Sequence, residues 1–102
     1  MKAELSDLFR EIKEQNLGRA ALEKYEQQLA ALYAEIMLDI GSLKKERALY
    51  FLARQRPETT DISIRRTFDG TPSGQRLIEL EVSVKAVARM YSSVRSRIYQ
   101  HL

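Results

Sequence analysis

Apolar side chains recur at alternating intervals of three and four residues over the C-terminal third of this 102-residue chain. This spacing places them on one side of an α-helix, and it is the pattern by which two helices pack along a common seam. Thr71 and Pro72 mark the start, because threonine offers an N-cap oxygen and proline presets the first helical φ. We therefore predict a helix over residues 72–100 whose packing seam is formed by Leu77, Leu80, Val84, Val87, Tyr91, Val94 and Ile98.

A second long amphipathic segment occupies the N-terminal half of the chain. Eight of ten heptad positions over residues 22–53 are apolar, and Asp39 and Glu46 are the two exceptions. The segment should end before Pro57, because the residue that precedes a proline is disfavoured in the α conformation. We therefore predict a helix over residues 19–55.

Two shorter segments complete the predicted fold. Residues 3–15 place apolar side chains at helical spacing and predict a short amphipathic helix. Residues 57–71 form a linker rich in turn and capping residues, within which residues 61–68 could be a strand or a short helix. We prefer the helix, because a single strand would have no neighbour to pair with. The predicted fold class is all-α, with residues 1–102 forming one domain: a helical hairpin of two long amphipathic helices, a short N-terminal helix and a short linker helix.

A pair of helices leaves part of its apolar surface without a partner, which favours oligomerisation. Around the interrupted heptad positions the apolar stripe of the longer helix widens, as expected when a straight helix drifts against a seven-residue repeat. We therefore expect a homo-oligomer with packing like that of a coiled coil, whose interface lies at Tyr33, Met37 and Ile40.

Several classes of function lack the residues they need. The chain has no cysteine and one histidine, His101, so neither a metal site nor histidine-based catalysis is expected. No spacing matches a phosphate-binding loop, and neighbouring acids such as Glu23 and Glu26 fit exposed helix positions better than a catalytic pair. We predict no enzyme activity, no catalytic residues and no cofactor. The N-terminus lacks the apolar run of a signal peptide and no segment reaches the length of a membrane span, so a cytoplasmic protein without membrane contact is expected.

Basic side chains dominate the C-terminal half. The net charge is +3, and no Asp or Glu occurs from Val82 onward. Cations beside aromatic rings can bind single-stranded DNA, because the cations neutralise phosphates while the rings stack on bases. The same pattern is also typical of a solvated helix face, or of cations near a helix C-terminus. The candidate nucleic-acid-binding residues form one group on each long helix: Lys44, Lys45, Arg47, Tyr50 and Arg54 on the first, and Lys85, Arg89, Arg95 and Arg97 on the second.

Short motifs occur in a recognisable order along the chain. They are Leu5 and Leu8 in a Leu-x-x-Leu turn, the steps Tyr25-Glu26 and Leu32-Tyr33, Lys44-Lys45-Glu46, the Lys-x-Arg element of Lys45 and Arg47 followed by Tyr50 and Phe51, and Ser-Val-Arg-Ser-Arg over residues 93–97. This order resembles the UvsY family of phage recombination mediators, and the likeness runs through most of the chain.

The resemblance implies a non-enzymatic mediator that binds single-stranded DNA, assembles into a ring, and helps a RecA-like recombinase displace single-strand-binding protein. It also implies that Lys45 and Arg47 contact the DNA. An alternative of another class is a small phage-type helical interaction module, an inhibitor or assembly factor that docks its apolar stripe on a host protein. Oligomeric state and affinity for DNA separate the two hypotheses.

Overall fold

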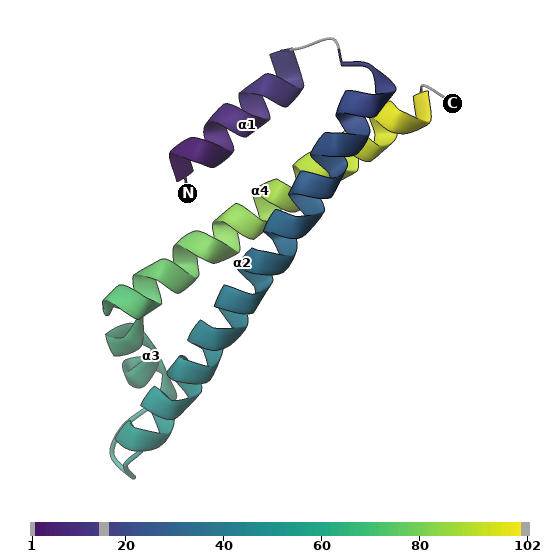
Figure 1. The fold of residues 1–102 in the computed structure, drawn as a ribbon. Coiled ribbons are helices and arrows are strands. Elements are labelled where there is room, and N and C mark those ends of the chain that lie inside the picture. Colours follow the sequence, from purple (N-terminus) through teal and green to yellow (C-terminus); the bar gives the residue numbers. More distant parts are fainter. Residues whose placement is uncertain (1, 15–16, 101–102) are drawn as a thin grey trace. The chain divides into compact units, whose positions relative to one another are not determined.

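The computed structural model describes residues 2–14 and 17–100, which form four helices and, within those ranges, no strand (Figure 1). These are α1 (Lys2–Glu14), α2 (Arg19–Arg54), α3 (Asp61–Asp69) and α4 (Pro72–Gln100). The all-α class is confirmed, and the segment that could have been a strand or a helix is the helix α3. The sole histidine, His101, lies outside the described residues.

The chain divides into two compact units, and each long helix contributes to both. We call Met1–Glu35 with Ser83–Leu102 the terminal unit and Ile36–Val82 the middle unit. The terminal unit therefore holds α1, the beginning of α2 and most of α4. The middle unit holds the rest of α2, α3 and the beginning of α4.

In the middle unit, α2 and α4 run antiparallel and are held in register by polar contacts. Asp39 lies 3.6 Å from the guanidinium of Arg76, and Ser73 donates a 2.8 Å hydrogen bond to Glu46. Asp39 and Glu46 are the two residues that interrupt the apolar heptads of α2. The interruptions are thus the places where the two helices exchange polar contacts at the edge of their seam.

Helix α3 packs its apolar side into the middle unit. The Oγ1 of Thr60 caps its first turn by accepting a 3.1 Å hydrogen bond from the backbone N–H of Ser63. Ile64 and Phe68, four residues apart, are both buried. The Phe68 ring meets the Tyr50 ring of α2 edge to face, with 5.3 Å between centroids.

The corner between α3 and α4 is unusually tight. Thr71 Oγ1 donates a 2.6 Å hydrogen bond to the carbonyl of Phe68 and accepts one of 3.1 Å from the N–H of Gly74, which confirms Thr71 as the N-cap of α4. The side chain of Gln75 donates to the carbonyl of Asp69 at 2.6 Å. The Phe68 carbonyl also accepts a 2.9 Å hydrogen bond from the backbone N–H of Thr71, so the last carbonyls of α3 are satisfied by the residues that begin α4.

In the terminal unit, α1 is attached through both apolar and polar contacts. Leu5 and Ile12 are buried. Arg97 of α4 donates a hydrogen bond to the carbonyl of Ile12, in the last turn of α1, where the helix has no backbone donor left to offer. Tyr25 of α2 donates to Glu11 at 3.3 Å. Partial burial raises the pKa of Tyr25, and the charge of the accepting Glu11 carboxylate raises it further.

Candidate nucleic-acid interface

The predicted cations of α2 do not form one surface. Lys45 and Arg47, the pair implied as the DNA contact, are two residues apart on a helix and therefore about 200° apart around its axis. Lys45 is exposed, whereas Arg47 is half-buried. Lys44, Arg47 and Arg54 share a side of α2 instead, at intervals of three and seven residues. A single strand running along one face could contact one member of the Lys-x-Arg pair but not both.

The ring of Tyr50, which was predicted to stack on a base, is covered by neighbouring side chains. The guanidinium of Arg54 stacks over the ring, 3.5 Å from its centroid, and Phe68 packs against it. A base could stack here only by displacing Arg54. Tyr50 is therefore a packing residue of the middle unit that holds Arg54 in place through a cation–π contact.

The four cations predicted on α4 fall into two pairs. Arg95 lies 3.7 Å from Glu26 of α2 and donates a 3.2 Å hydrogen bond to the Tyr99 hydroxyl, a bond that raises the pKa of the guanidinium. Arg97 caps α1 through the Ile12 carbonyl. Lys85 and Arg89 are exposed, and neither forms an ion pair with the residues that the structure describes. Lys85 and Arg89 are thus the α4 cations best placed to bind an external anion.

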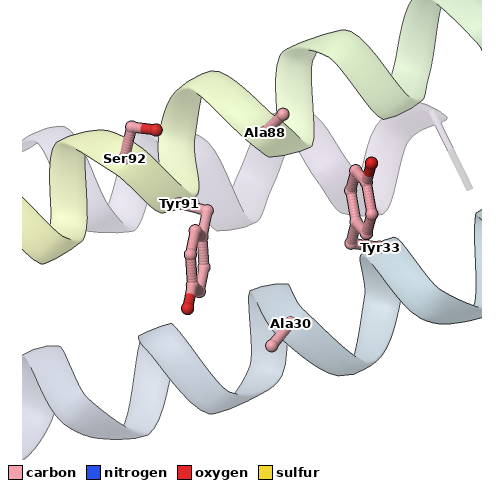
Figure 2. Close-up of a pocket in the computed structure, with 5 residues that line it drawn as sticks. All are labelled: Ala30, Tyr33, Ala88, Tyr91 and Ser92. Atoms are coloured by element: carbon pink, nitrogen blue, oxygen red, sulfur yellow. The ribbon is translucent and has the colours of Figure 1, made fainter.

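The structure also contains a groove that was not anticipated from the sequence. It lies in the terminal unit, has a volume of about 380 Å³, and is lined by Ala30 and Tyr33 of α2 and by Ala88, Tyr91 and Ser92 of α4 (Figure 2). Figure 2 shows the two rings pointing across it from opposite helices, Tyr91 toward α2 and Tyr33 toward α4. The two alanines leave the space between the rings open, because neither has a side chain long enough to fill it.

The three residues predicted as an oligomer interface separate in the structure. Ile40 is 4% exposed and packs inside the middle unit, so it cannot be reached by a second copy without unfolding. Tyr33 lines the groove of the terminal unit, and Met37, which is 43% exposed, belongs to the middle unit. The structure therefore divides the predicted interface: Ile40 belongs to the core, while Tyr33 and Met37 are exposed.

Comparison of the chain with sequence models of protein families, with curated proteins and with solved structures gives no match. Within residues 2–14 and 17–100, no helix is long and apolar enough to cross a membrane, and no cluster of His, Cys, Asp or Glu could hold a metal ion. The described side chains that line the groove are two tyrosines, two alanines and a serine.

Proposed function

We propose that this chain is a non-enzymatic accessory protein of DNA recombination that binds single-stranded DNA as a homo-oligomer in the cytoplasm. This is the function that the resemblance to the UvsY family implies, and in it the protein would assist a RecA-like recombinase against single-strand-binding protein. The single observation that carries the DNA-binding part concerns Lys85 and Arg89, which are exposed on the acid-free part of α4 and form no ion pair with the described residues.

The surroundings of this pair favour a polyanion over an isolated anion. Lys85, Arg89, Ser92 and Ser96 recur at intervals of four, three and four residues, so they follow one side of α4 for three turns. The serines are short and exposed, which leaves room for a backbone to approach the helix closely. An extended phosphate chain could follow this side of α4 from one cation to the next.

Replacing both cations should reduce the salt dependence of DNA binding. Each phosphate neutralised on a single strand contributes about 0.7 to the slope of log K against log salt, so Lys85→Gln/Arg89→Gln should lower the slope by about 1.4 and weaken binding at every salt concentration. The measurement is fluorescence anisotropy of a labelled oligothymidylate across a salt series.

A matched control is available in the same unit. Arg10 and Arg19 are exposed, but each is paired within its own helix, with Asp7 at 2.9 Å and Glu23 at 3.0 Å. Arg10→Gln/Arg19→Gln removes the same charge and should leave the slope within error of the unmodified protein. If both double variants lowered the slope equally, Lys85 and Arg89 would contribute only through the net charge of the protein. If the unmodified protein did not bind the oligonucleotide at low salt, the proposed function would be wrong.

A specific observation also favours a second candidate, the helical interaction module. Leu38, Leu49 and Leu52 lie on one side of α2 in the middle unit and are 76%, 59% and 68% exposed. Their intervals of eleven and three residues keep them within about 60° of one another around the helix. Exposed leucines gathered on one helix side are typical of a surface that another protein or another copy covers.

Leu49→Gln/Leu52→Gln should separate self-association from docking on another protein. If copies assemble through this side, light scattering should show an oligomer for the unmodified protein and a smaller species for the variant. The helix content should not change, because both positions are exposed and such substitutions alter stability by about 0.5 kcal/mol or less. A monomer in both cases would contradict self-association here and favour the interaction module.

A further inference from the structure

The groove between Tyr33 and Tyr91 has the features of a site for a flat aromatic ligand. Its volume of about 380 Å³ falls within the range of roughly 300–1,000 Å³ that small-molecule sites occupy. Neither tyrosine ring packs against another ring of the described residues, in contrast to Tyr50. The guanidinium of Arg95 lies over the Tyr91 ring at 5.8 Å from its centroid, farther away than the 3.5 Å that separates Arg54 from Tyr50. A planar group can therefore stack on the Tyr33 ring and on the face of the Tyr91 ring that Arg95 does not cover.

The charges around the groove select an anionic ligand. On the α2 side, Glu23 and Glu26 lie seven and four residues before Ala30, and each is already paired with an arginine, Arg19 or Arg95. On the α4 side, Lys85 and Arg89 lie three residues before Ala88 and Ser92, respectively, and carry unpaired positive charge. An aromatic ligand that carries negative charge beside its ring matches this arrangement, whereas a purely apolar peptide segment would leave both cations unused.

We propose that the groove holds an unstacked base of single-stranded DNA between Tyr33 and Tyr91 while Lys85 and Arg89 contact the phosphates next to that base. Ser92 lines the same groove, next to Tyr91 on α4. This inference rests on the proposed function and adds to it the place where a base is bound. It predicts that binding depends on the bases as well as on the phosphates.

The test compares an oligothymidylate with an abasic oligonucleotide of the same length and charge. Stacking of a base on aromatic side chains should make the oligothymidylate bind roughly 5- to 150-fold more tightly. Tyr33→Phe and Tyr91→Phe keep the rings and should keep this preference. Tyr33→Leu and Tyr91→Leu should lose most of it while the salt slope stays unchanged.

A second variant keeps both tyrosines, so that a lost preference for bases cannot be attributed to misfolding of the tyrosine variants. Ala30 is exposed and lines the groove, so Ala30→Leu fills the space between the rings at a position where leucine is a good helix former. It should abolish the preference for bases. Ala31→Leu, at the neighbouring exposed position outside the groove lining, should not.

The outcomes distinguish this inference from the proposed function. Equal affinity of the unmodified protein for both oligonucleotides would overturn the groove site and leave DNA binding through the cations standing. An unchanged preference in folded Ala30→Leu would overturn it as well. Failure to bind either oligonucleotide at low salt would overturn the proposed function and the groove site together.

Discussion

Gly74→Ala should destabilise the protein by about 3 kcal/mol, because the helix corner leaves no room for a methyl group. A Cβ at position 74 would lie 2.0 Å from the carbonyl oxygen of Phe68 and 2.7 Å from the Cα of Asp69. Both obstacles are backbone atoms, so relief requires α3 to move away from α4. That movement would stretch the bonds that Thr71 makes to both helices. The higher helix propensity of alanine returns only about 1 kcal/mol.

Urea denaturation followed by circular dichroism measures this loss, and two other glycines calibrate it. A Cβ at Gly70 would meet its nearest neighbour at 3.5 Å, and at Gly41 it would meet nothing within 4 Å. Gly70→Ala should therefore be close to neutral. Gly41→Ala, in the interior of α2, should raise stability by up to about 1 kcal/mol. A Gly74→Ala variant as stable as Gly70→Ala would show that the corner is looser than described.

Phe68→Ala should cost about 3–5 kcal/mol, the range for deleting a fully buried aromatic ring. The ring is 1% exposed and is the largest of the most deeply buried side chains. Its loss opens a cavity between α3 and the rest of the middle unit and also removes the edge-to-face contact with Tyr50. Phe68→Leu, which fills part of the cavity, should cost less.

The same helix supplies the control for this substitution. Ile62 is 69% exposed on α3, and Ile62→Ala should change the free energy of unfolding by no more than about 0.5 kcal/mol. A small effect of Phe68→Ala would mean that α3 contributes little to folding. In that case α3 would also protect the Tyr50 ring poorly, and nitration of tyrosines followed by peptide mapping should find Tyr50 readily modified in the unmodified protein.

The helices could be predicted because their signals are local. Pro57 limits α2, Thr71 and Pro72 begin α4, and the apolar spacing in between needs no information from the rest of the chain. The choice of a helix for residues 61–68 was also correct, and Thr60 supplies its N-cap. Burial of Ile40 was missed, because spacing alone does not say which side of a wide stripe meets the partner helix.

The candidate site depends on contacts between distant residues, which spacing does not reveal. Tyr50 and Tyr91 both occupy heptad positions, but Tyr50 meets the large ring of Phe68 while Tyr91 lines a groove that includes the small Ala30. Arg97 has the appearance of a free cation until α1, 85 residues away, places a carbonyl beside it. The groove could have been predicted only from the small residues Ala30 and Ala88, each of which lies three residues before a tyrosine on its own helix.

The polar contacts of Asp39 and Glu46 with α4 bear on how many alternative alignments the two helices can adopt. A seam made only of leucine, isoleucine and valine looks nearly the same after a shift of seven residues, so several alignments would have similar free energies. With Arg76 and Ser73 as their partners, the two acids meet hydrogen-bonding groups in one alignment only. Replacing both acids with leucine would therefore strengthen the apolar packing between the two helices. It would also reduce the free-energy difference between the native alignment and the shifted alignments.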